Sequence, residues 1–286
     1  MEKQAKKAIR PLQKQSRPGK ETSLKPHAET MPKVYKAGKL QDKVVIITGG
    51  DSGIGKATAL LFAKEGADIV VAYLNETADA NDTKEKVNAY GRACLLISGD
   101  IGKETHCKKI IAQTIKKFGK IDILINNAGV HWEADSIEDI PTAQLMKTFH
   151  SNFFSCFWLV KYALPHLKKG SNIINTTSVT AYRGSPKLID YASTKGAIVA
   201  FTRSLSNSLL KKGIRVNAVA PGPVWTPLIA STFSKKKVAS FGSDSPMERA
   251  GEPNEIAPCF LFLASDDASF MTGQVLHANG GEIING

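Results

Sequence analysis

From Asp42 onward, short runs of apolar and β-branched residues alternate with longer segments of helical pattern. This alternation is typical of a parallel sheet covered by helices, and near-continuous apolar runs suit strands that are buried on both faces. The sequence therefore predicts a doubly wound α/β fold with a seven-stranded parallel sheet. The predicted strands are 44–47, 69–72, 93–97, 121–125, 172–175, 214–219 and 274–277, and the predicted helices are 54–66, 76–90, 103–118, 142–169, 190–212 and 253–264.

Residues 1–40 differ in composition from the rest of the chain. This segment has eleven Lys and Arg against three Glu, so it carries +8 of the net charge of +12. A polar, lysine-rich segment with several prolines cannot bury enough apolar surface to fold alone. We expect a basic N-terminal arm, flexible or draped over the surface, and a single domain over 41–286. A nucleic-acid or anionic-surface tether and a targeting peptide are the alternatives for the arm.

Cysteine spacing and hydropathy indicate in which compartment the protein works and which kinds of partner it binds. Cys94, Cys107, Cys156 and Cys259 form neither a CxxC pair nor a cluster of metal-ligand spacing, so we expect no metal and reduced thiols, as in the cytoplasm. No apolar run approaches the roughly 20 residues that span a bilayer, and the N-terminus lacks the apolar stretch of a secretory signal. Outside the arm no basic motif is interleaved with aromatic residues. We therefore expect a small-molecule substrate, and neither nucleic acid nor membrane, as partner.

The first predicted strand runs into a glycine-rich segment, 48–55, and a helical segment follows at once. Glycines permit a tight turn and let backbone N–H groups approach a pyrophosphate, whose charge is favoured by a helix N-terminus. The spacing is GxxxGxG rather than GxGxxG, so a structural strand-to-helix turn remains the alternative. The candidate cofactor-binding residues are Gly49, Asp51, Ser52, Gly53, Ile54 and Gly55.

Three further features follow later strands, at the sheet edge where doubly wound folds bind ligands. A carboxylate after the third strand can bind an adenine amino group, an Asn-Asn-Ala-Gly segment after the fourth leaves room for a ribose, and a Pro-Gly turn after the sixth can bind a carboxamide. Each alone could be a simple turn, but their order favours a nicotinamide dinucleotide site. The added candidates are Asp100, Ile101, Asn127, Ala128, Gly129, Pro221, Gly222, Val224 and Thr226.

The end of the second strand bears on the choice between NAD and NADP. The strand closes in Tyr73, Leu74, Asn75 and Glu76, with no Arg or Lys nearby. An acid there binds the 2′-hydroxyl of NAD, whereas a cation binds the 2′-phosphate of NADP. Because Glu76 and Asp51 would repel a phosphate, the sequence favours NAD. The alternative for Asn75 and Glu76 is a helix cap and a first-turn acid.

Tyr191 and Lys195 lie four residues apart in a predicted helix, close enough to interact. A neighbouring cation stabilises a phenolate and lowers its pKa, which suits proton transfer to an alkoxide formed by hydride transfer. Ser178 follows the fifth strand and can bind a substrate oxygen. Asn152 is a polar residue within an aromatic-rich helix. Taken singly, each has a structural alternative: an accidental pair, a loop serine, and a buried amide or helix bend.

Together these residues resemble the short-chain dehydrogenase/reductase (SDR) family over Asp42 to Gly286. The glycine motif, the Asn-Asn-Ala-Gly segment, the thirteen-residue step from Ser178 to Tyr191 and the Pro-Gly turn carry the resemblance. It implies a Rossmann fold in which Tyr191 is the acid/base, Lys195 lowers its pKa and holds the nicotinamide ribose, Ser178 orients the substrate oxygen, and Asn152 supports a proton relay. The ending 272–281 resembles the bacterial members grouped as glucose and ribitol dehydrogenase-like.

The resemblance implies an NAD(P)-dependent oxidoreductase acting on CH–OH and C=O groups. Enoyl reductases of similar fold usually have a longer Tyr-to-Lys gap, and extended epimerases usually show GxxGxxG, so neither fits. Segment 226–249 is the expected substrate loop, and the candidate pocket residues are His131, Trp132, Tyr182 and Trp225. The alternative function is a non-catalytic dinucleotide-binding sensor, and the sequence does not name the substrate.

Apolar residues in the predicted helices 142–169 and 190–212 bear on assembly. They exceed what one sheet face would consume, and they include Phe153, Phe157, Leu159, Val199, Phe201 and Leu205. In the family that the chain resembles, these two helices pack between subunits, which implies a homotetramer. The alternative is that these side chains simply fill the core of the monomer.

Overall fold

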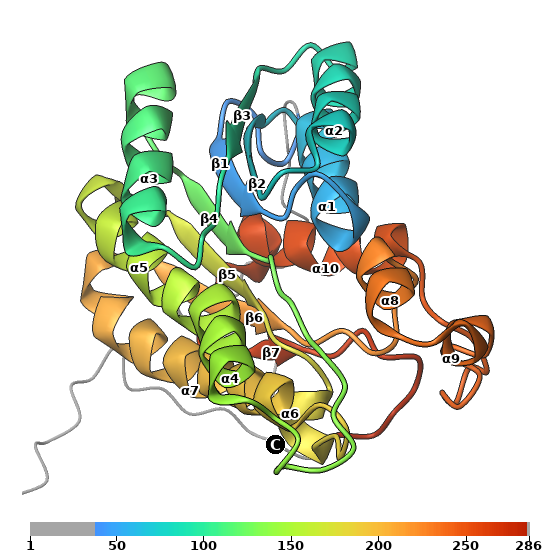
Figure 1. Ribbon diagram of the computed structural model, residues 1–286. Helices are drawn as coiled ribbons and strands as arrows, with labels where there is room; N and C mark the ends of the chain where they lie inside the picture. The colour runs from blue at the N-terminus through green and yellow to red at the C-terminus, as the bar shows by residue number, and fades with distance from the viewer. Residues whose placement is uncertain (1–37, 285–286) are drawn as a thin grey trace, which may run out of the picture. The chain divides into compact units, whose positions relative to one another are not determined.

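The computed structural model describes residues 38–284, and it contains one seven-stranded sheet (Figure 1). All neighbouring strands are parallel, in the order β3-β2-β1-β4-β5-β6-β7. The chain order reverses between β1 and β4, so the sheet is doubly wound and the fold prediction is confirmed. The strands are β1 Val44–Thr48, β2 Asp68–Tyr73, β3 Cys94–Ser98, β4 Ile123–Asn126, β5 Asn172–Thr176, β6 Arg215–Val219 and β7 Val275–Leu276.

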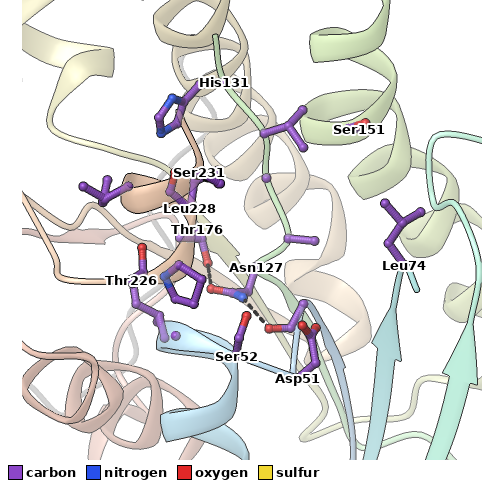
Figure 2. A pocket seen from close by; sticks show the side chains of 18 of the residues that line it. Asp51, Ser52, Leu74, Asn127, His131, Ser151, Thr176, Thr226, Leu228 and Ser231 are labelled. Atoms are coloured by element: carbon purple, nitrogen blue, oxygen red, sulfur yellow. Dashed lines mark hydrogen bonds between the residues drawn. The ribbon is translucent and has the colours of Figure 1, made fainter. Parts of the chain in front are cut away.

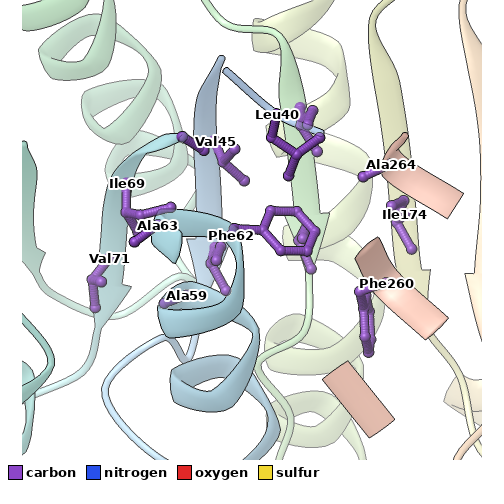
Figure 3. Close-up of a cluster of buried hydrophobic side chains, with 14 of the residues drawn as sticks. Leu40, Val45, Ala59, Phe62, Ala63, Ile69, Val71, Ile174, Phe260 and Ala264 are labelled. Atoms are coloured by element: carbon purple, nitrogen blue, oxygen red, sulfur yellow. The ribbon is translucent and has the colours of Figure 1, made fainter. Parts of the chain in front are cut away.

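Two apolar cores lie on opposite faces of the sheet, because alternate residues of each strand point to opposite sides. In β1, Val45 and Ile47 face a core that contains Phe62 of α1 and Phe260 of α10, whereas Ile46 faces the core on the other side (Figure 3). The first core also takes residues of α2, and the second takes residues of α3, α5 and α7. The helix bounds are α1 Gly53–Lys64, α2 Thr77–Ala89, α3 Glu104–Phe118, α5 Ser155–Ala163, α7 Ile189–Leu209 and α10 Pro253–Ala264.

The structure divides the predicted helix 142–169 into several pieces. This region consists of helix α4 Thr142–Phe149, the π-helical turn η2 His150–Phe154, helix α5 and the 3₁₀ turn η3 Leu164–His166. Three short helices were not predicted, α6 Thr180–Arg183, α8 Pro227–Thr232 and α9 Lys235–Ala239. Segments of four to six residues are too short to show a helical periodicity, which explains why the sequence pattern missed them.

The N-terminal boundary of the domain remains a prediction, since residues 1–37 of the expected arm lie outside the described residues. Leu40, which the sequence analysis placed in the arm, is 1% exposed and belongs to the first core. Its backbone N–H donates to Glu65 O at 2.9 Å. Within 38–284, no helix is both long and apolar enough to cross a membrane.

Gly55→Ala is expected to lower the free energy of unfolding. An added methyl group would overlap the backbone oxygen of Gly49 and lie 2.7 Å from Asn127 Nδ2. Overpacking of this kind costs about 1–3 kcal/mol. In the matched control Gly196→Ala, within α7, nothing lies within 4 Å of the added carbon, so stability should be unchanged or rise by up to ~1 kcal/mol. Urea unfolding measures both, and a Gly55→Ala variant as stable as the wild type would contradict this packing role.

Candidate active site

A cavity of about 560 Å³ opens at the carboxyl ends of the strands, around the switch point between β1 and β4 (Figure 2). Such crevices are where doubly wound sheets bind ligands. Most of the predicted site residues line it. They are Gly49, Asp51, Ser52, Gly53, Ile54, Tyr73, Glu76, Asp100, Ile101, Asn127, Ala128, Gly129, Ser178, Tyr191, Lys195, Pro221, Gly222, Val224 and Thr226.

Three predicted residues, Gly55, Asn75 and Asn152, do not line the cavity. Gly55 packs against the backbone of Gly49, so its lack of a side chain permits the close contact between helix and loop. Asn75 is exposed beyond the end of β2. The predicted cofactor contacts of Gly55 and Asn75 stay predictions.

Hydrogen bonds hold the loops after β1 and β4 together at the switch point. Thr48 Oγ1 accepts from the backbone N–H groups of Asn127 and Ala128, at 2.9 and 3.0 Å. Asn127 Nδ2 donates back to Thr48 O at 3.0 Å. Gly49 has a φ of 64° and Gly53 a φ of 50°, a left-handed conformation that favours glycine. This turn leads directly into the N-terminus of α1, where backbone N–H groups favour an anion.

The cavity end near the glycine loop is acidic. Asp51, Glu76 and Asp79 all line it. Burial raises the pKa of Asp51, and the charges of Glu76 and Asp79 raise it further, while hydrogen bonds act in the opposite direction. No arginine lines the cavity within the described part of the chain, and Lys147 is paired with Asp100 at 3.2 Å. A ligand group placed beside Asp51 therefore meets negative charge.

A row of buried hydrogen bonds joins the centre of the sheet to α7. Asn126 Nδ2 in β4 donates to Asn175 Oδ1 in β5 at 2.8 Å, and Asn175 Nδ2 donates to Thr202 Oγ1 in α7 at 2.9 Å. All three side chains are buried. Buried polar groups that are hydrogen-bonded to one another favour a packing arrangement of one register. The row therefore sets how α7 lies against the sheet.

Tyr191 and Lys195 lie one turn apart in α7, and Ser178 follows β5. The Lys195 side chain is buried, its Nζ donates to Thr176 O at 2.7 Å, and it lies 5.4 Å from the centroid of the Tyr191 ring. Thr177 Oγ1 donates to the backbone oxygen of Lys195 at 2.8 Å. The structure thus brings the predicted tyrosine, lysine and serine to the same cavity as the glycine loop.

Burial governs the protonation of this group. It raises the pKa of Tyr191 to about 12, although the Ser178 hydroxyl lowers it, and it lowers the pKa of Lys195 to about 8. At neutral pH the tyrosine is protonated and the lysine is charged. The sequence prediction assigned the lowering of the Tyr191 pKa to Lys195; here burial outweighs any such effect, and Ser178 is the group that opposes it.

Asn152 lies in the π-helical turn and is fully buried. Its Oδ1 accepts from Val130 N at 2.8 Å, and its Nδ2 donates to Val130 O at 2.9 Å and to Thr194 Oγ1 at 3.2 Å. The amide therefore holds the loop after β4. A carbon added at Gly129 would lie 3.5 Å from Asn152 Oδ1 and 3.6 Å from Lys195 Nζ, so both polar atoms lie against this glycine.

The substrate part of the cavity is formed partly as predicted. His131 lines it, as do Pro227, Leu228, Ile229, Ser231 and Phe241 of the expected substrate loop. Trp132 and Trp225 are 39% and 46% exposed and do not line it, and Tyr182 packs on His277 outside it. Lys147 and Ser151, which also line it, were missed because no local motif marks them. Within 38–284 no three His, Cys, Asp or Glu side chains form a metal-binding group.

Comparisons with known proteins agree with this geometry. Residues 49–282 match a family model described as enoyl-(acyl carrier protein) reductase. The glucose and ribitol dehydrogenase of carrot, Daucus carota, is 49% identical over 96% of this chain and 97% of its own length. The chloroplastic NADPH-dependent aldehyde reductase 1 of Arabidopsis thaliana is 48% identical over 94% of this chain and 96% of its own length.

A solved structure is also similar over nearly the whole described domain. The short-chain dehydrogenase of Burkholderia cenocepacia, in complex with NADP, has a TM-score of 0.81 and 27% identity, covering 85% of this chain and 99% of that chain. The fold and the site define a Rossmann-fold oxidoreductase. The chain belongs to the SDR family, which confirms the resemblance, including that to the glucose and ribitol dehydrogenase-like members.

Proposed function

We propose that this enzyme transfers a hydride between a nicotinamide cofactor and an alcohol or carbonyl substrate. One observation carries the proposal: Ser178, Tyr191 and Lys195 line the same cavity as the glycine-rich segment 49–54. When bound, NAD or NADP accepts or supplies the hydride. The glycine-rich segment and the N-terminus of α1 would hold the pyrophosphate, and Lys195 would hold the nicotinamide ribose.

Tyr191 is the proposed acid/base. With a pKa of about 12 it holds its proton at neutral pH, so it can donate that proton to the oxygen of a carbonyl that is being reduced. The charged ammonium of Lys195 would stabilise the phenolate that remains. Ser178 would donate a hydrogen bond to the substrate oxygen, and Asn152 would support the relay that returns a proton to the tyrosine.

Carbonyl–alcohol chemistry is favoured over enoyl reduction. The family model is described by an enoyl reductase, but Tyr191 and Lys195 are only four residues apart, whereas enoyl reductases of similar fold usually have a longer gap. The carrot and Arabidopsis relatives are named for a polyol or sugar and for aldehydes. We therefore assign the reaction to CH–OH and C=O groups.

Tyr191→Phe should leave cofactor binding nearly intact and lower turnover by roughly 100-fold or more, because only the transferable proton is removed. The matched control is Tyr182→Phe, since Tyr182 lies outside this cavity and its hydroxyl has no hydrogen bond to a described residue. Fluorescence titration gives the cofactor Kd, and a screen of polyols, sugars, aldehydes and ketones gives turnover. Near-normal turnover of Tyr191→Phe would refute the assignment. A wild type that binds cofactor but turns over nothing would favour the dinucleotide sensor.

We propose NAD rather than NADP as the preferred cofactor, because Asp51, Glu76 and Asp79 surround the place expected for the adenosine ribose. Against this choice stand two similar proteins, the NADPH-dependent reductase of Arabidopsis and the Burkholderia dehydrogenase in complex with NADP. Repulsion of a 2′-phosphate should weaken NADP binding roughly tenfold relative to NAD. The two dissociation constants measure this, and an Asp51→Asn, Glu76→Gln double variant should narrow the difference. Clearly tighter NADP binding by the wild type would contradict the proposal.

We also propose a homotetramer. Phe157 of α5 is 50% exposed and lies 5.8 Å, centroid to centroid, from Phe201 of α7, and Phe153 contacts Phe201 edge-on. In contrast, Leu159 and Val199 are buried within the monomer, so the predicted set divides between core and surface. Exposed aromatic faces of this kind suit obligate interfaces. Light scattering decides it, and a stable monomer at micromolar concentration would contradict the tetramer.

The proposed location is the cytoplasm. It is supported by the four cysteines, all of which are free in the described structure. Cell fractionation tests it, and recovery of the protein in a membrane or secreted fraction would contradict it.

A further inference from the structure

His131 is a polar side chain in the substrate part of the cavity to which the proposed mechanism gives no role. It is 5% exposed and lines the cavity. Its Nδ1 is out of reach of solvent and has no hydrogen-bond partner within 38–284, so Nε2 is the ring nitrogen that remains for a ligand in the cavity. Most buried polar groups are hydrogen-bonded, because desolvation without a partner is unfavourable. An imidazole left without partners beside a cavity therefore points to a ligand group.

Two aromatic rings hold the imidazole in place. It lies edge-on to Tyr191, with centroids 5.2 Å apart and planes at 72°, and it packs on Phe233 at 5.2 Å. In Figure 2, His131 lies at the opposite end of the cavity from Asp51 and Ser52. A substrate whose oxygen reaches Tyr191 must bring its neighbouring atoms close to His131.

The ring is neutral at physiological pH. Burial lowers the pKa of His131 to about 4, and the charge of Lys195 lowers it further. A neutral imidazole offers one N–H donor and one acceptor nitrogen. Nε2 alone can either donate to a hydroxyl group or accept from one, according to the tautomer, whereas a neutral ring brings no charge to compensate a carboxylate or a phosphate.

We propose that His131 binds a hydroxyl group on a carbon close to the reacting carbon, and so makes the enzyme selective for hydroxylated aldehydes, ketones and polyols. This role rests on the proposed function, because it needs the reacting oxygen at Tyr191. It makes His131 a specificity-determining residue, distinct from the proton donor. A site built to hydrogen-bond a substrate hydroxyl discriminates strongly against analogues that lack it, since its own polar group is then left unpaired.

The test compares glyceraldehyde with propanal, which differ only in two hydroxyl groups. Using the full-length enzyme and its preferred cofactor, we expect the wild-type kcat/KM to be at least roughly tenfold higher for glyceraldehyde. His131→Phe keeps a ring between Tyr191 and Phe233 but removes both nitrogens. It should lower kcat/KM for glyceraldehyde about tenfold and leave that for propanal within about twofold. His131→Gln, which keeps a donor and an acceptor, should retain part of the preference.

His277→Phe is the matched control, since His277 also lies edge-on to a tyrosine, at 4.7 Å from Tyr182, but outside this cavity. It should leave both rates unchanged. Equal losses for both aldehydes in His131→Phe would show that the ring only packs against Tyr191 and would overturn the proposal. A wild type with no preference between the aldehydes would overturn it while leaving the proposed function intact. A wild type that reduces no carbonyl would overturn both.

Discussion

The buried hydrogen-bond row from Asn126 through Asn175 to Thr202 fixes the catalytic helix α7 to the sheet, and the site depends on it. Apolar packing alone permits a helix to slide over a strand, because its contacts are not directional. Directional bonds between buried amides and a hydroxyl allow one register. That register brings Lys195 Nζ to the end of β5, where it donates to Thr176 O. The position of Tyr191, one turn earlier, follows from it.

The charges of the site are separated along the cavity. Asp51, Glu76 and Asp79 lie near the glycine loop, and the buried ammonium of Lys195 lies beside Tyr191. Burial makes the loss of charge from Lys195 easier and the loss of the proton from Tyr191 harder. At neutral pH Tyr191 is protonated and Lys195 is charged, so the tyrosine can donate a proton while a cation lies beside it. An alkoxide forming there would therefore meet both a proton and a compensating charge.

Local patterns were sufficient to predict the sheet, the glycine loop and the pair Tyr191 and Lys195, because each is contained in a few consecutive residues. Asn152 was noticed, but the π-helical turn around it was not predicted, since that turn is associated with contacts to Val130 and Thr194 in other segments. The short helices α8 and α9 lack enough residues to show a period. The sequence could not predict whether the Trp132 side chain is exposed or buried, because a single aromatic residue occurs in both environments.

The substrate part of the site depends on a different kind of support from the cofactor part. A bridge between Val224 and Gly251 joins the two ends of segment 225–250, so the segment leaves the body of the domain and returns to it at one place. Helices as short as α8 and α9 are not stable alone. Phe233 packs on His131, and Lys237 forms an ion pair with Glu133 and lies over the Phe233 ring. The contacts to His131 and Glu133 reach the loop that follows β4. Because the same loop carries His131 beside Tyr191, the substrate segment packs directly against the residue that we propose to recognise the substrate.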